Sequence, residues 1–123
     1  MQYVYIAVFG ACGCLARYVI SGWTYRLCGT ALPWGTLAVN VAGSFCIGLI
    51  METSLRSSLL LPELRIGLTV GFLGGFTTFS TFSYETIRLL EEGSLLQAGG
   101  NILLSVLACV LCAWLGIFVA RQL

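Results

Sequence analysis

The sequence contains no lysine, no aspartate and no histidine, and only 9% of its 123 residues are charged. Without histidine and aspartate the chain cannot build a Ser-His-Asp triad or a metal-dependent hydrolase site. No phosphate-binding loop is present to power a pump. The net charge of +1 also argues against a nucleic-acid partner. We therefore expect a protein that is not an enzyme.

The scarcity of charge also bears on the solvent of the chain, since a soluble domain keeps roughly a quarter of its residues charged. Here 59% of the residues are hydrophobic and the mean hydropathy is +0.97, which predicts that lipid surrounds the protein. Four segments reach the length of about 20 apolar residues that crosses a bilayer. They are Gln2–Tyr25, Pro33–Thr53, Pro62–Leu90 and Leu95–Ala120. We expect residues 1–123 to form one all-α, four-helix transmembrane module.

The N-terminal residues and the six cysteines agree with a membrane module. The first residues, MQYVYIAVFG, carry no basic leader, so we expect the first segment to remain as a membrane span. The six cysteines lie mostly in apolar runs, and no Cys-x-x-Cys pair has histidine partners. We interpret the cysteines as small packing residues rather than metal ligands.

Arginines divide almost evenly between the two expected sides of the membrane. Arg56, Arg65 and Arg121 share the side of the termini, whereas Arg26 and Arg88 belong to the opposite side. This balance favours insertion in both orientations, with each chain paired to an inverted copy. A small protein with few loop charges could also show this balance by chance.

Small or polar residues recur at four-residue spacing on one face of three spans. These stripes are Gly10, Cys14, Arg17 and Ser21; Thr36, Asn40, Ser44 and Gly48; and Asn101, Ser105, Cys109 and Ala113. Helix packing explains most of them. It explains Asn40 and Arg17 less well, because such groups at membrane depth usually mark a solute path. The Asn40 amide can donate to an anion, whereas Arg17 either contacts an anionic solute or reaches an interface.

The stretch GGFTTFSTFSYE, residues 74–85, interrupts the third span. Gly74 and Gly75 disfavour a helix, and the threonine hydroxyls compete for backbone partners. A broken helix frees carbonyl oxygens that suit a hard cation such as Na⁺ and creates a new N-terminus that favours an anion. Phe76, Phe79 and Phe82 recur every three residues, and their positive ring edges can attract an anion. Ordinary packing or lipid contact is the alternative for each ring.

These stretches also resemble a known family. GFLGGFTTFSTFSYE, PWGTLAVNVAGSF and GACGCLARY are similar to the Fluc (CrcB) family of small fluoride channels, and the similarity extends over essentially the whole chain. The resemblance implies an antiparallel homodimer with two pores. It also implies a central structural Na⁺ held by backbone carbonyls at positions that match Gly74 and Thr77.

The resemblance further implies a fluoride route. Phe79 and Phe82 match residues that line it, Asn40 matches an asparagine beside it, and Arg17 matches an arginine of the pore entrance. A polar track would comprise Ser80, Thr81, Glu85, Asn101 and Ser105. Cys109 departs from the hydroxyl residue found in some relatives, and a thiol is a poorer donor, so its part in the track is in doubt.

We therefore expect a passive channel that exports fluoride across a bacterial plasma membrane. Two other functions remain possible. A small dual-topology, proton-coupled drug exporter would need a carboxylate in the first span, where this chain has Arg17 and no acid. A non-transporting membrane assembly subunit would explain the small-residue stripes, but it gives no reason for Asn40 or for the broken third helix.

Overall fold

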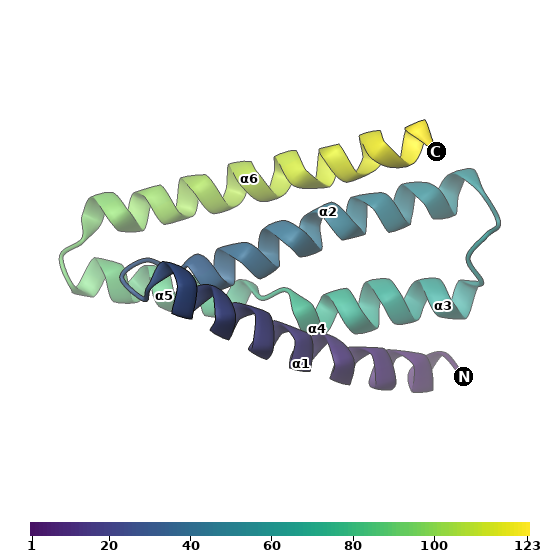
Figure 1. The fold of residues 1–123 in the computed structure, drawn as a ribbon, viewed down its shortest axis with the longest axis horizontal. Helices are drawn as coiled ribbons and strands as arrows, with labels where there is room; N and C mark the ends of the chain where they lie inside the picture. Colours follow the sequence, from purple (N-terminus) through teal and green to yellow (C-terminus); the bar gives the residue numbers. More distant parts are fainter.

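The computed structural model describes residues 1–123, which are helical almost throughout and contain no strand (Figure 1). The elements are α1 (Gln2–Cys28), α2 (Trp34–Arg56), α3 (Pro62–Ile66), the π-helical η1 (Gly67–Leu73), α4 (Gly74–Phe76), α5 (Phe79–Glu91) and α6 (Leu95–Gln122). The predicted all-α class is confirmed.

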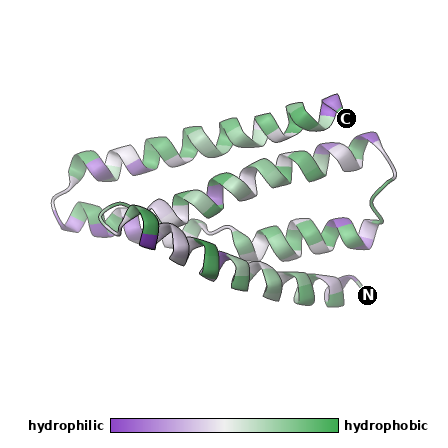
Figure 2. Cartoon of the chain, in the orientation of Figure 1, coloured by the Kyte–Doolittle hydropathy of each residue, from purple (hydrophilic) through white to green (hydrophobic).

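Three of these helices, α1, α2 and α6, are long and apolar enough to cross a membrane. Figure 2 shows α6 as mostly apolar, with hydrophilic residues near its two ends, and its most apolar stretch of 18 residues has a mean hydropathy of 2.8. Pro33 directly precedes α2 and Pro62 is the first residue of α3, where a missing N–H leaves no hydrogen bond unmade. The three long helices agree with the predicted first, second and fourth spans to within a few residues.

The predicted third span is a row of shorter elements, α3, η1, α4 and α5. The row is interrupted at Thr77 and Thr78, whose backbones are extended (ψ 160° and 117°). Gly74 and Gly75, which we expected to weaken the helix, are themselves helical. A Cβ on Gly75 would lie 2.6 Å from the Gly10 carbonyl oxygen, so this glycine serves a close contact with α1 rather than the interruption.

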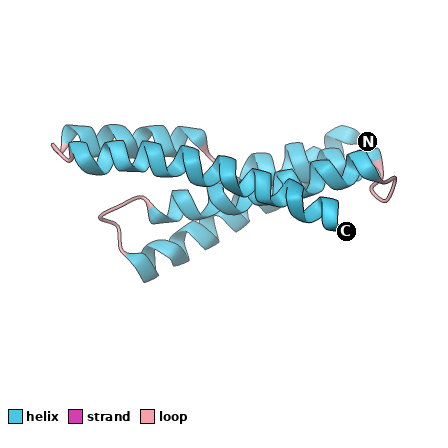
Figure 3. Ribbon diagram, turned by 90° about the horizontal axis from the view of Figure 1, so that it is seen from above, coloured by secondary structure: helices cyan, strands magenta, loops and turns pink.

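The elements run side by side along the long axis of the molecule (Figure 1). Both termini and the α2–α3 connection lie at one end, and the α1–α2 and α5–α6 connections lie at the other. The view from above contains only helices and short loops (Figure 3). The row from α3 to α5 therefore runs between the same two ends as the three long helices.

Glycines set the spacing between the helices. A Cβ on Gly48 of α2 would lie 2.2 Å from the Ala113 carbonyl oxygen, and one on Gly116 of α6 would lie 2.1 Å from the Phe45 carbonyl oxygen. A Cβ on Gly13 of α1 would lie 2.0 Å from the Phe72 carbonyl oxygen in η1. The backbones thus touch along α2 and α6 and along α1 and η1, as small residues allow in membrane proteins.

Little of the chain is buried within a single copy. Only 18 of 123 residues are buried, and the core cluster consists of Val39, Leu73 and Phe76. Most of the large apolar side chains on α1 and α6 are exposed. A soluble monomer rarely leaves such an extensive apolar surface uncovered, so the surroundings of this protein must themselves be apolar.

Replacing Gly116 by alanine should destabilise the fold, because the new methyl group meets the α2 backbone, which can move only by separating the two helices. We expect a loss of about 1–3 kcal/mol in the free energy of unfolding, measured by denaturant titration in detergent micelles. Gly99→Ala on the same helix meets no atom within 4 Å and is the matched control. It should be neutral or stabilising by up to about 1 kcal/mol. Equal effects of the two changes would contradict the close contact of α2 with α6.

Candidate functional site

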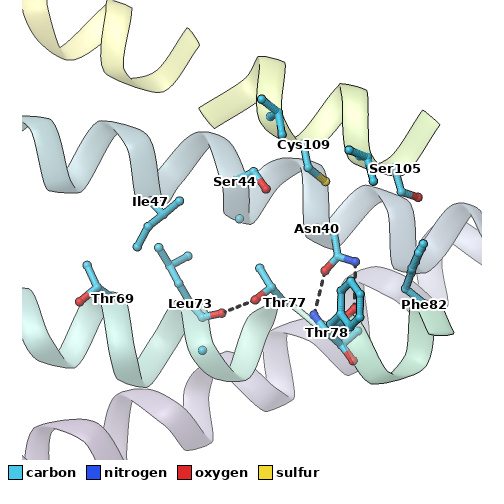
Figure 4. Close-up of a pocket in the computed structure, with 15 residues that line it drawn as sticks. Asn40, Ser44, Ile47, Thr69, Leu73, Thr77, Thr78, Phe82, Ser105 and Cys109 are labelled. Atoms are coloured by element: carbon cyan, nitrogen blue, oxygen red, sulfur yellow. Dashed lines mark hydrogen bonds between the residues drawn. The ribbon is translucent and has the colours of Figure 1, made fainter. Parts of the chain in front are cut away.

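A pocket of about 470 Å³ lies beside the interruption between α4 and α5 (Figure 4). We call it the central pocket. Its polar wall comes from four parts of the chain: Asn40 and Ser44 on α2, Thr69 on η1, Thr77 and Thr78 at the interruption, and Ser105 and Cys109 on α6. Phe79 and Phe82 of α5 line it as well. The pocket thus brings together two rings, an amide and several hydroxyl groups from segments far apart in the sequence.

The side chain of Asn40 holds the interruption in place. Its Nδ2 donates to the Thr78 carbonyl oxygen at 3.0 Å, and the Thr78 N–H donates to Oδ1 at 2.8 Å (Figure 4). The amide therefore gives the Thr78 N–H the partner that an extended residue lacks in the helix, and it also donates to the Thr78 carbonyl. A primary amide carries two N–H donors, and no other hydrogen bond in the structure uses the second one. Asn40 can therefore support the backbone and still donate to a solute.

Thr78 also begins α5. Its hydroxyl oxygen accepts the Thr81 N–H at 3.2 Å, which makes it the N-cap of the helix. The same hydroxyl lies 3.0 Å from the Thr81 hydroxyl and 3.3 Å from that of Ser80. The predicted track residues Ser80 and Thr81 thus gather at the positive end of the α5 dipole, next to the central pocket.

The two phenylalanine rings differ in exposure. Their centroids are 5.4 Å apart and their planes meet at 42°. Phe82 is 8% exposed, whereas Phe79 is 80% exposed although it lines the same pocket. One ring is therefore fixed within the chain, and the other extends onto a surface that this copy leaves uncovered.

Two backbone carbonyls lose their usual helical donors at the interruption. In a continuous helix the Thr78 N–H would donate to the Gly74 carbonyl, but it donates to Asn40 instead. The Thr81 N–H would donate to the Thr77 carbonyl, but it donates to the Thr78 hydroxyl. Carbonyl oxygens of this kind are ligands for a hard monovalent cation. The residues named for Na⁺, Gly74 and Thr77, fit such an ion chemically.

Glu85 lies outside the central pocket, in a separate polar cluster. Both of its carboxylate oxygens accept hydrogen bonds, one from the Tyr25 hydroxyl at 2.5 Å and one from the Thr36 hydroxyl. Sequence reasoning did not assign Tyr25 to any site, and it noted Thr36 only as part of a stripe. The single available signal was the spacing of Thr36 from Asn40 and of Glu85 from Phe82, each about one helical turn.

The remaining predicted residues are dispersed. Asn101 donates to the Thr86 hydroxyl at 2.9 Å and lies 3.4 Å from the Ser105 hydroxyl, so a short polar chain connects α5 with α6. Thr86 is buried and was not identified from the sequence. Arg17 is half-buried, does not line the central pocket and has no ion-pair partner. The structure thus brings Asn40, Phe79, Phe82 and Ser105 together but does not bring Arg17 to them.

Comparison with known proteins gives matches that extend over nearly the whole chain. Residues 4–117 match the family described as CrcB-like protein, Camphor Resistance (CrcB). A "Fluoride-specific ion channel FluC" of Geotalea uraniireducens is 68% identical over 98% of this chain and 97% of the relative. Proteins of the same name from Syntrophotalea carbinolica and Geobacter metallireducens are each 64% identical, over 100% and 98% of this chain. The match covers the three long helices and the whole interrupted row, and the chain belongs to the CrcB-like family.

Proposed function

We propose that the protein is a fluoride-selective channel that passively exports fluoride from the cytoplasm. Relatives that share about two thirds of its residues over nearly their whole length are named fluoride-specific ion channels. The observation that carries the proposal in this chain is the central pocket, where an amide and hydroxyl donors face two phenyl rings at a helix N-terminus. The proposal assigns no catalytic residue.

The chemistry of the pocket suits a small, strongly hydrated anion. A pore must replace the water that fluoride loses with hydrogen-bond donors at close range. The second N–H of Asn40 offers such a donor, and the Ser105 hydroxyl becomes one when it turns away from Asn101 Oδ1, to which it donates at 3.4 Å. The edges of Phe79 and Phe82 add positive potential without an acceptor. Apolar walls at a narrow point would then exclude larger anions.

Permeation of this kind needs no energy-coupling site. Fluoride in acidic surroundings crosses the membrane as HF, dissociates in the near-neutral cytoplasm and accumulates there. A channel lets the negative membrane potential drive the anion out, since moving one charge through 100 mV is worth about 2.3 kcal/mol. The lack of any nucleotide-binding motif is consistent with this passive route.

We further propose that two chains form an antiparallel dimer with two pores in a bacterial plasma membrane. Two features of the single copy support a partner: Phe79 is 80% exposed, and a Cβ on Gly74 would meet nothing within 4 Å. The row from α3 to α5 would then be the fourth span, its interruption covered by the second copy and not by lipid. The nearly even division of arginines between the two ends suits both orientations.

A structural Na⁺ is the last element of the proposal. The carbonyl oxygens of Gly74 and Thr77 would hold it, and a second copy would double this ligand set. The ion would neutralise the partial charges of the freed carbonyls and keep the two interruptions facing each other. Because such an ion would be enclosed between two chains, we expect it to stay bound and not to be transported.

A proton-coupled cation exporter is the weaker alternative. Such a carrier needs a membrane-embedded carboxylate that exchanges protons for cations. The only deep carboxylate, Glu85, is bound by two hydroxyl groups, and the first span contains Arg17 instead of an acid. The printed names of the relatives also favour the channel.

The proposed function is tested with proteoliposomes loaded with KF and KCl and opened to potassium by valinomycin. Ion-selective electrodes follow fluoride and chloride in the outer solution. We expect rapid fluoride efflux while chloride is retained, because the donors of the pocket fit only the smaller anion. Correctly inserted protein that releases no fluoride would refute the channel and favour the assembly subunit.

Phe79→Ile and Phe82→Ile should each lower the fluoride efflux rate by at least about tenfold, since an aliphatic side chain has no positive edge. Phe118→Ile is the matched control and should leave the rate unchanged. Phe118 lies near the C-terminal end of α6, is stacked on Trp114 and does not line the central pocket. Gel filtration checks that the assembly is intact. Wild-type rates in both pocket variants would remove the rings from the mechanism.

Sodium should not accompany fluoride. Radioactive Na⁺ outside the vesicles should remain there during fluoride efflux, since the carbonyl ligands offer a bound ion no exit. The same assay with an external choline solution should give an unchanged fluoride rate. Uptake of sodium in a fixed ratio to fluoride would show that the ion is transported.

A further inference from the structure

The cluster around Glu85 joins three helices through one carboxylate. The Tyr25 hydroxyl of α1 donates to Oε2 at 2.5 Å, and the Thr36 hydroxyl of α2 donates to Oε1. The two hydroxyl oxygens also lie 3.2 Å from each other. Glu85 itself belongs to α5 and is half-buried. Both oxygens of this carboxylate are therefore held by donors from other helices.

This cluster lies one helical turn from the central pocket. Thr36 precedes Asn40 by four residues on α2, and Glu85 follows Phe82 by three residues on α5. Side chains at these spacings lie on the same face of a helix and are direct neighbours. An anion that moves from Asn40 and Phe82 toward this turn of the two helices would meet the carboxylate of Glu85.

A free carboxylate at this place would oppose the proposed function. Two negative charges a few ångströms apart repel each other strongly in a medium of low dielectric constant. Hydrogen bonds to a carboxylate spread its charge onto the donors and fix its direction. The repulsion then depends on where the donors hold the carboxylate.

The Tyr25 ring is itself firmly placed. A Cβ on Gly35 would lie 2.4 Å from Cε2 of Tyr25 and 2.6 Å from the Ser21 carbonyl oxygen. The ring therefore lies directly on the backbone of α2, where only glycine leaves room for it. A phenol fixed in this way loses little freedom when it donates to Glu85, so its hydroxyl is a preorganised donor.

We propose that Tyr25 is a positioning residue that holds the carboxylate of Glu85 against α1 and α2 and thereby sets the rate of fluoride permeation. The proposal rests on the channel function proposed above. Tyr25 acts through Glu85 and does not itself need to touch the ion. Its removal should free the carboxylate to turn toward the face that carries Asn40 and Phe82.

A double-mutant cycle with Tyr25→Phe, Glu85→Gln and the combined variant tests this in the fluoride efflux assay. Tyr25→Phe should lower the rate by about tenfold, which is the worth of one hydrogen bond to a charged group. In the Glu85→Gln background, where no charge remains to be held, the same change should alter the rate by less than about twofold. Tyr18→Phe, on the exposed face of α1, is the matched control and should leave the rate unchanged.

Equal factors in the two backgrounds would show that Tyr25 only supports the fold, and a wild-type rate in Tyr25→Phe would overturn the proposal outright. If Tyr25→Phe fails to assemble, Thr36→Val removes the other donor and allows the same cycle to be completed.

The infrared spectrum gives a second test that does not depend on transport. The carboxylate band of Glu85 is the one that Glu85→Gln removes. It should shift in Tyr25→Phe and remain in place in Tyr18→Phe, because only the first change removes a donor. An unshifted band would overturn the contact even in a conducting channel. Wild-type vesicles without fluoride efflux would instead refute the channel function, and the band would still decide whether Tyr25 holds Glu85.

Discussion

The pair of hydrogen bonds between Asn40 and Thr78 is the interaction on which the site depends. An interrupted helix leaves backbone N–H and C=O groups without partners, which costs several kcal/mol in lipid, of the order of 4–8 kcal/mol for an unpaired amide. One amide side chain of α2 satisfies both groups of Thr78. The pairing of the Thr78 N–H with Asn40 leaves the Gly74 carbonyl free, while the Thr78 hydroxyl caps α5 and leaves the Thr77 carbonyl free.

Glycine contacts explain how such a small chain holds the helices around the central pocket in fixed positions. Lipid offers no hydrophobic force that would press one helix on another, so close backbone contact must supply the attraction through dispersion. Gly48 and Gly116 bring α2 onto α6, and Gly13 brings α1 onto η1. The pocket lies between these two contacts, with Asn40 on α2 facing residues of α5 and α6. The spacing of the helices that carry the pocket's lining residues is therefore set by backbone contacts.

The sequence was enough to predict the class of protein and much of the central pocket. It did not reveal the partners of the polar residues outside the pocket, which are Tyr25 for Glu85 and Thr86 for Asn101. Asn40 was singled out because an amide is unusual in an apolar helix, whereas Phe79, Phe82 and Ser105 were named from their spacing and from the family resemblance; all four line the central pocket. The interruption was expected within residues 74–85 from both the glycines and the threonines, and it lies at Thr77 and Thr78. Gly74 and Gly75 are helical, because a glycine serves helix contact as readily as helix breakage. The contact of Tyr25 with Glu85 spans 60 residues, and no local pattern reveals which of five tyrosines reaches it. Long-range pairing of this kind depends on how helices are rotated about their axes.

The separation of Asn40 from Thr78 has a consequence for biogenesis. The two partners are 38 residues apart, and α2 is synthesised well before the row that it must support. The interrupted row is therefore unsuited to lipid until it reaches α2, because its polar backbone groups find no partner there. Because α2 precedes this row in the chain, Asn40 can be in place before residues 62–91 are synthesised. The order of helices along the chain is thus also the order in which the protein can be assembled.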